Sequence, residues 1–163
     1  MVGISVYVET SVWSFAFAED VPNYRQDTLA FFECCRRRVI EPVISPVVLA
    51  EIGKAPHPLG RRLADLLREI APTVVGVSDE AERLAGAFLR ESVVPRTKPE
   101  DARHVAVAFC EGLDVLVSWN FRHIASVRRA DRFNAVAVLE GFYKPLRIVS
   151  PPEVTYDNET ETD

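Results

Sequence analysis

Residues 97–120, TKPEDARHVAVAFCEGLDVLVSWN, read as a helix, a tight turn and a short buried strand. Thr97 and Glu100 have the S/T-x-x-E spacing of a helix capping box. Gly112 suits the C-cap of this helix, and the apolar run 115–117 then forms the strand. Polar residues that directly follow a strand lie at the carboxyl edge of its sheet. In open α/β sheets, ligands bind at that edge.

The rest of the chain alternates strand-like and helix-like segments. Apolar, β-branched runs predict strands at 4–8, 39–44, 73–77 and 146–149, and helical spacing predicts helices at 23–38, from 46 onward, and at 61–70, 79–91 and 129–142. Pro42 interrupts the second run, so that strand is expected to begin at Val43 or to lie near an edge. Thr10, Ser11 and Val12 follow the first strand and lead into an expected loop that carries Trp13, Phe15 and Phe17. The alternation predicts an α/β fold, a three-layer α/β/α sandwich with a central parallel sheet of four to five strands.

Length and charge indicate one folded domain followed by a tail. The chain has 163 residues, 48% of them hydrophobic, which is enough for one substantial core. Residues 151–163 hold five acids and no Lys or Arg, so they account for the whole formal charge of -5. The domain is therefore expected at 1–150, electrically neutral overall, and 151–163 are expected to form an acidic, mobile tail.

Cysteine usage and hydropathy bear on the cellular setting. Cys34 and Cys35 are adjacent and Cys110 is isolated, so neither a disulfide framework nor a C-x-x-C metal spacing is present. This pattern favours a reduced, cytoplasmic environment. No apolar run approaches the roughly 18 residues of a membrane span, and the N-terminal run lacks the features of a signal peptide.

Oxygen-bearing side chains occupy equivalent places in this scheme. Glu9 follows the first strand, Glu51 lies early in the helix after the second, Asp101 opens the helix before the fourth, and Asn120 follows the fourth strand. Because parallel strands share one carboxyl edge, these side chains are expected to meet. An oxygen-rich pocket without Cys suits Mg²⁺ or Mn²⁺ rather than Zn²⁺. Such a cation can activate water and stabilise charge on a phosphoryl group, which is phosphodiester-cleaving chemistry.

A structural explanation exists for each acid taken singly, because carboxylates stabilise helix starts whether or not they bind anything. His104 follows Asp101 by three residues and can share its helix face, where a supporting role is favoured over direct metal ligation. His123 and Arg122 are either phosphate contacts or solvated surface. The metal hypothesis therefore depends on several acids meeting in one place.

Three blocks of the chain resemble the signature blocks of PIN-domain proteins, in particular the toxin component of VapBC-type toxin–antitoxin pairs. The blocks are YVETSVW at 7–13, SPVVLAEI at 45–52 and DARHVAVAFCEGLDVLVSWNFRHI at 101–124, and the resemblance spans residues 6–149. It implies a PIN-like sheet and a Mg²⁺- or Mn²⁺-dependent endoribonuclease, a hydrolase of RNA phosphodiester bonds. It also implies a homodimer that is inhibited by a small antitoxin protein.

The resemblance assigns roles to particular residues. It implies Glu9, Glu51 and Asp101 as catalytic metal ligands, Asn120 as a further catalytic residue, and Ser11, Ser118 and His104 as supporting residues. Two positions depart from the family pattern. Glu9 stands where the family usually has Asp, which lengthens the ligand by one methylene. Asn120 stands where the family has a fourth acid, and a site with three carboxylates binds a cation less strongly than one with four.

Two alternatives remain open. A catalytically weak or inactive PIN module that acts by binding RNA or protein is consistent with Asn120. A doubly wound domain that binds a phosphorylated small molecule is the other, although neither G-x-G-x-x-G nor G-x-x-x-x-G-K-[ST] occurs in the chain. Cleavage of RNA, binding of RNA without cleavage, and binding of a nucleotide alone would distinguish the three.

Overall fold

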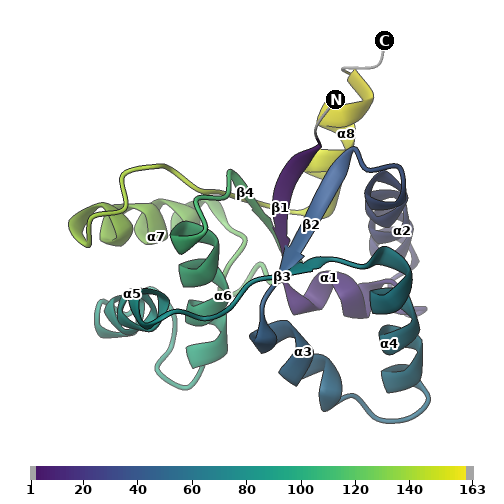
Figure 1. Cartoon of the computed structure of the whole chain (residues 1–163), viewed down its shortest axis with the longest axis horizontal. Helices are drawn as coiled ribbons and strands as arrows, with labels where there is room; N and C mark the ends of the chain where they lie inside the picture. The colour runs from purple at the N-terminus through teal and green to yellow at the C-terminus, as the bar shows by residue number, and fades with distance from the viewer. Residues whose placement is uncertain (1–2, 161–163) are drawn as a thin grey trace.

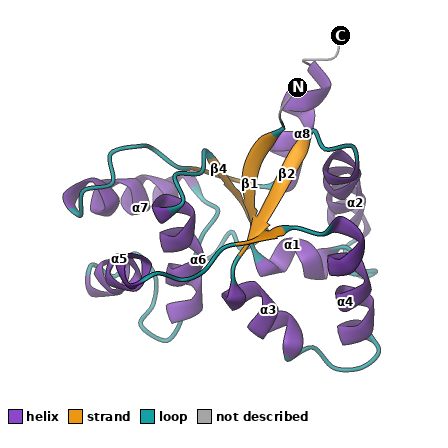
Figure 2. Cartoon of the chain, in the orientation of Figure 1, coloured by secondary structure: helices purple, strands orange, loops and turns teal. Residues whose placement is uncertain are grey.

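The computed structural model describes the backbone of residues 3–160 and the side chains of residues 3–155. Strands and helices alternate along this part of the chain (Figure 2). In chain order the elements are β1 (Ile4–Val8), α1 (Thr10–Phe15), α2 (Pro22–Arg36), β2 (Ile40–Ile44), α3 (Pro46–Gly53), α4 (Leu59–Ile70), β3 (Thr73–Val74), α5 (Asp79–Arg90), α6 (Pro99–Cys110), β4 (Val115–Val117), α7 (Val127–Leu139), β5 (Arg147–Val149) and α8 (Pro151–Thr160). No helix in the described range is long and apolar enough to cross a bilayer.

The strands form a single parallel sheet in the order β3-β2-β1-β4-β5. Helices α1, α2 and α4 lie on one side of it and α5, α6 and α7 on the other (Figure 1). The predicted three-layer α/β/α sandwich is therefore confirmed. The strand order reverses at β1, because β2 and β3 extend the sheet on one side of β1 and β4 and β5 extend it on the other. Parallel sheets bind ligands outside the carboxyl ends of the strands at such a reversal.

The second strand begins earlier than Val43, and it lies one strand in from the edge of the sheet. β2 begins at Ile40 and lies between β1 and β3, with Pro42 paired to Val6. The carbonyl of Ile44 accepts from the N–H of Val75, so the backbone groups of Pro42, two residues earlier, also face β3. Pairing with β3 begins only at Val43. The missing N–H of Pro42 therefore faces a position beyond the short β3, where no ladder bond is lost.

Helix α6 ends as predicted but begins differently. Gly112 has a φ of +65°, and the bonds from its N–H to Phe109 and from the N–H of Leu113 to Ala108 form a Schellman motif. At the other end the predicted capping box is absent, because Lys98 is the N-cap and no side chain caps it. Asp101 nevertheless lies in the first turn of the helix, as expected.

Residues 10–15 form a helix rather than the expected loop. α1 begins directly after Glu9, whose carboxylate accepts from the N–H of Ser11 and so caps the helix. Val12 and Trp13 are fully buried beneath it. Trp13 therefore belongs to the core, and Phe15 is partly buried against it.

The acidic segment after Ser150 also departs from expectation, since it begins with a helix rather than a mobile tail. α8 packs against α2, and Pro151, Val154 and Thr155 are buried. The hydroxyl of Thr155 donates to the carbonyl of Pro151 within the helix. The tail prediction is corrected for this helix, and its last part, 161–163, lies outside the described residues.

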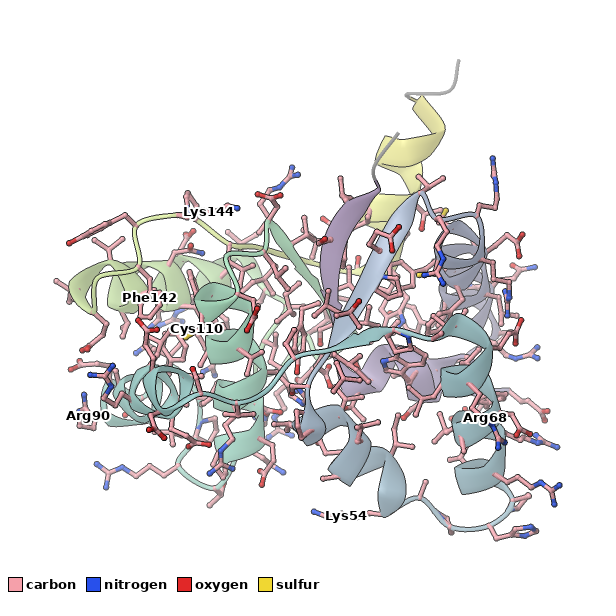
Figure 3. All side chains as sticks on the ribbon, in the orientation of Figure 1. Lys54, Arg68, Arg90, Cys110, Phe142 and Lys144 are labelled. Atoms are coloured by element: carbon pink, nitrogen blue, oxygen red, sulfur yellow. The ribbon has the colours of Figure 1, made fainter. Side chains whose placement is uncertain are left out.

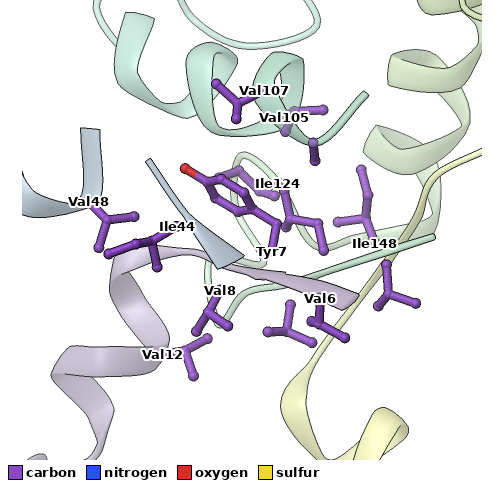
Figure 4. Close-up of a cluster of buried hydrophobic side chains, with 14 of the residues drawn as sticks. Val6, Tyr7, Val8, Val12, Ile44, Val48, Val105, Val107, Ile124 and Ile148 are labelled. Carbon is purple, nitrogen blue, oxygen red and sulfur yellow. The ribbon is translucent and has the colours of Figure 1, made fainter. Parts of the chain in front are cut away.

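The core lies on both faces of the central strand. Tyr7 of β1 points toward Val105 and Val107 of α6, whereas Val6 and Val8 point to the opposite side (Figure 4). All three strand residues are fully buried, which explains why the run 4–8 carries no apolar–polar alternation. Side chains fill the space between the layers, and charged ones such as Lys54, Arg68 and Arg90 point outward (Figure 3).

Candidate metal centre

Glu9 lies at the strand reversal, immediately beyond β1. Its Oε1 accepts hydrogen bonds from the hydroxyls of Ser11 at 2.7 Å and Ser118 at 2.5 Å, and its Oε2 accepts from the N–H of Ser11 at 2.9 Å. The side chain is only 4% exposed. Ser118 follows β4, so two neighbouring strands supply the groups that fix this carboxylate. Ser11 and Ser118 both lie where supporting residues were expected.

Glu51 reaches the same region from α3. Ser45 caps this helix by accepting from the N–H of Val47, and Glu51 follows on the second turn. Its Oε1 accepts from the hydroxyl of Thr10 at 2.8 Å and lies 2.5 Å from Nε2 of His104. Both contacts use Oε1, and therefore Oε2 is left for a ligand.

His104 is fully buried and links Glu51 to the core. Its Nδ1 lies 2.7 Å from the hydroxyl of Tyr7, which in turn lies 2.8 Å from the hydroxyl of Ser45. Burial raises the pKa of Tyr7 far above its usual value, so this phenol keeps its proton and can donate it. The ionised carboxylate of Glu51 can only accept, so Nε2 of His104 carries the proton that it donates to Glu51. His104 is therefore positioned to hold Glu51 rather than to bind a cation through Nε2.

Asp101 has a separate set of partners. Its Oδ2 lies 3.2 Å from Nδ1 of His123 and 3.5 Å from Nδ2 of Asn120. The amide oxygen of Asn120 accepts from the N–H of His123 at 2.9 Å, and the N–H of Asn120 donates to Ser118. Asn120 thus lies beside Asp101, as its place after β4 implied. Because both contacts of Asp101 use Oδ2, Oδ1 is left for a ligand.

The acids of the site differ in how their ionisation is perturbed. Burial and the charge of Glu9 raise the pKa of Asp101, with His104 and His123 opposing in part. Burial also disfavours ionised Glu51, but the hydrogen bonds from His104 and Thr10 and the charge of His104 outweigh it and lower the pKa of that carboxyl. The negative charge of Glu9 thus disfavours ionisation of Asp101.

The geometry brings most of the expected ligands together. Glu9, Glu51 and His104 each offer one ligand atom within 4.8 Å of the other two. Asp101 is outside this tight group, although it lies one helical turn before His104 on α6. Among the residues whose side chains are described, no Lys or Arg forms an ion pair with any of the three acids. An oxygen-rich cluster with no Lys or Arg partner among the described side chains fits a hard divalent cation.

Several residues of the site were not expected from the sequence. Thr10 donates to Glu51, Tyr7 orients His104, Ser45 extends this chain of hydrogen bonds, and His123 contacts Asp101 instead of facing solvent alone. Thr10 could have been predicted as a supporting residue, because it is polar and directly follows the expected metal ligand Glu9. Tyr7 gives no such signal, because an aromatic residue in an apolar strand is read as core.

Comparisons with known proteins do not identify the site. A scan against models of protein families and a search of curated proteins each found no match to this chain. The candidate centre is therefore defined by its geometry alone. Hydroxyl groups hold Glu9, His104 holds Glu51, and Asp101 is their neighbour on α6.

Proposed function

We propose that this protein is a Mg²⁺- or Mn²⁺-dependent endoribonuclease of the PIN type. The observation that carries the proposal is the convergence of Glu9 and Glu51 at the strand reversal, with Asp101 beside them on α6 and only hydroxyl, amide and histidine partners around the three acids. Carboxylates so arranged gain most from a divalent cation, which removes their mutual repulsion. The three sequence blocks that resemble PIN-domain proteins contain all of these residues.

In this proposal Glu9, Glu51 and Asp101 hold the cation. When bound, the cation supplies Lewis acidity, activating water as the nucleophile and stabilising the charge that builds on the phosphoryl oxygens. Ser11 and Ser118 keep Glu9 in place, and Thr10 and His104 keep Glu51 in place. Such outer partners fix the orientation of ligating oxygens, so the site is organised before a cation arrives.

Asn120 has a positioning role in this proposal. Its amide oxygen already accepts from the N–H of His123, and its amide nitrogen faces Asp101. Asn120 and His123 therefore hold Oδ2 of Asp101 and direct Oδ1 toward the cation. A fourth carboxylate at position 120 would add charge to a cluster in which Glu9 already raises the pKa of Asp101.

The biological setting follows from the same resemblance. We propose a cytoplasmic toxin whose substrate is RNA, which forms a homodimer and is inhibited by a cognate antitoxin protein. An antitoxin peptide that covers the site would block access of RNA to Glu51 and Asp101, which are the more exposed acids at 29% and 14%. Purification with the product of an adjacent small reading frame would test this part.

RNA cleavage tests the enzymatic proposal. Purified protein should cut a mixed-sequence RNA in Mn²⁺ or Mg²⁺, should stop cutting when EDTA is added, and should lose activity in Asp101→Asn. Asp114→Asn is the matched control, because Asp114 is an exposed acid that pairs with Lys144 near the amino end of β4. Cleavage that persists equally in Asp101→Asn would overturn the assignment of the site.

A non-catalytic PIN module is the second candidate, and the amide at position 120 favours it. Binding of RNA without cleavage, in every divalent cation tested, would select this alternative. Restoring an acid with Asn120→Asp would then be informative, because a gain of cleavage would trace the inactivity to the missing charge.

A further inference from the structure

Four aromatic rings gather beside the candidate metal centre. They are Phe15 of α1, Tyr24 of α2, and Trp119 and Phe121 after β4, and we call them the ring cluster. The centroid of Trp119 lies 4.6 Å from that of Tyr24, 5.9 Å from that of Phe121 and 5.9 Å from that of Phe15. Tyr24 and Phe121 also contact each other, with centroids 6.5 Å apart. The cluster thus joins two helices to the segment that carries Ser118 and Asn120.

The cluster is tied rigidly to the centre through Trp119. The indole N–H of Trp119 donates to the hydroxyl of Thr28 at 2.8 Å, and its backbone N–H donates to the hydroxyl of Ser11 at 2.9 Å. The same Ser11 hydroxyl donates to Glu9. Two hydrogen bonds, from Trp119 to Ser11 and from Ser11 to Glu9, therefore connect the ring cluster to a proposed metal ligand. A molecule bound on the cluster would lie in a fixed position relative to the cation.

Burial changes steeply across the ring cluster. Trp119 is 7% exposed, whereas Tyr24 is 42% exposed and Phe121 is 48% exposed. Phe121 also lines an open hollow of about 620 Å³ between α7 and β5, whose other walls include Arg147 and two acids, Asp131 and Glu153. Two aromatic faces thus remain in solvent at the rim of the centre, and one of them has room beside it for another planar group.

Unpaired nucleobases are the planar groups that fit this surface. Single-stranded RNA presents base faces that stack on aromatic side chains, whereas the bases of a duplex are already stacked on one another. The exposed Arg122, next to Phe121, supplies a cation for the phosphate that accompanies a stacked base. A purely apolar partner would not use the adjacent Arg122 and the neighbouring carboxylate centre.

We propose that Tyr24 and Phe121 form a base-stacking subsite, which holds unpaired bases of the RNA beside the carboxylates. This inference rests on the proposed ribonuclease function. It assigns the choice of substrate to the ring cluster and the cleavage to the carboxylates. The two parts of the site can therefore be tested separately.

The test compares three RNA probes in EDTA, so that binding is measured without cleavage. They are a fluorescein-labelled single-stranded decanucleotide, an abasic strand with the same phosphates, and the decanucleotide in a duplex. Phe121→Ala and Tyr24→Ala should each weaken single-strand binding by about tenfold, since stacking contributes about 1–3 kcal/mol per base. Binding of the abasic strand and the duplex should not change, and Phe121→Trp should retain single-strand affinity.

Tyr143→Ala is the matched control. Tyr143 is 77% exposed and lies in the connection before β5, at the amino end of the sheet, where its neighbour Lys144 pairs with Asp114. Removing this exposed ring should leave the affinity for all three probes unchanged. A loss as large as that of Phe121→Ala would show a general effect of surface aromatics and would overturn the inference.

Further outcomes separate this inference from the proposed function. Equal binding of the single strand by wild type, Phe121→Ala and Tyr24→Ala, with metal-dependent cleavage intact, overturns the ring cluster alone. A change of sedimentation mass in Phe121→Ala with unchanged RNA affinity also overturns it, because the rings would then contact protein. Failure of the wild type to bind or cleave any RNA overturns both proposals.

Discussion

Nε2 of His104 lies 2.5 Å from Oε1 of Glu51, and the histidine is fully buried while the carboxylate is 29% exposed. The histidine is held in turn by the hydroxyl of Tyr7. A proposed metal ligand at the surface is thus oriented from the core, through β1 and α6. The side chains that support the site are therefore also part of the fold, and substitutions can separate the two contributions.

Replacing His104 should weaken metal binding more than it alters the fold. His104→Leu removes the donor to Oε1 of Glu51 while keeping a buried side chain of similar size, and loss of such a partner typically costs about 10–100-fold in metal affinity. His104→Gln, which keeps a terminal N–H donor, should lose less. Titration calorimetry with Mn²⁺ measures both, and Mn²⁺ affinity in His104→Leu equal to that of the wild type would refute the role assigned to His104.

Removing the hydroxyl of Tyr7 should lower stability. In Tyr7→Phe the hydroxyl of Ser45 and Nδ1 of His104 each lose a buried partner, which costs about 1–3 kcal/mol. Urea denaturation should show this loss in the free energy of unfolding. Tyr143→Phe is the matched control, since the 77% exposed Tyr143 loses only a solvated hydroxyl. Equal midpoints for the two variants would contradict the buried chain of hydrogen bonds.

Asp101→Asn should stabilise the metal-free protein at neutral pH. Because burial and Glu9 raise the pKa of Asp101 in the fold, its carboxyl favours the folded state below the ordinary carboxyl pKa and loses that contribution as pH rises through the raised pKa. The amide cannot ionise, so it avoids the loss. Thermal unfolding in EDTA should give a higher Tm for Asp101→Asn at pH 7, by roughly 2–4 °C per kcal/mol gained, and little difference at pH 3.

Glu51→Gln should destabilise the metal-free protein at neutral pH. The pKa of Glu51 is lowered because the contacts with His104 and Thr10 outweigh burial, so its ionised form stabilises the fold above the ordinary carboxyl pKa and loses this effect as pH falls through the lowered pKa. The substitution should therefore lower Tm at pH 7 in EDTA. If both variants shift Tm in the same direction, the electrostatic description of the site is wrong.

Helix α8 should contribute to global stability. Val154 is 4% exposed where α8 packs against α2, and Val154→Ala should cost about 1–3 kcal/mol through lost burial and a residual cavity. Glu153→Ala on the same helix is the comparison, since the hydrogen bonds of Glu153 to described residues are with Ser150 at the surface, and no buried apolar side chain is lost. A urea midpoint for Val154→Ala that matches the wild type would mean that the segment after Ser150 does not dock in solution.

The sequence predicted the sheet because its strands are mostly apolar and its helices are bounded by Ser45, Ser78 and Gly112. The convergence of Glu9 and Glu51 followed from one rule, that parallel strands end at the same edge. Helix α1 was missed because a six-residue helix of aromatic and β-branched residues has no sequence periodicity to read, and its cap is a Glu. The acidic composition of 151–163 concealed α8, because the burial of Val154 depends on a distant surface of α2.

The position of Pro42 shows a further limit. A proline in an interior strand is tolerated here only because β3 is too short to reach it. The pairing of β2 with β3 joins segments that are distant in the chain, so the sequence around Pro42 does not show it. In the same way, the partners of His104 come from β1 and α3, and their proximity follows from the sheet order rather than from any spacing along the chain.

Direct measurement of Mn²⁺ binding tests whether the carboxylates form a metal centre. Titration calorimetry or electron paramagnetic resonance should show a saturable site in the wild type. Mn²⁺ binding should weaken in Glu9→Gln, Glu51→Gln and Asp101→Asn and remain unchanged in the Asp114→Asn control. If the combined Glu9→Gln/Glu51→Gln/Asp101→Asn variant binds Mn²⁺ as tightly as the wild type, these side chains do not hold the cation and the proposed metal centre is wrong.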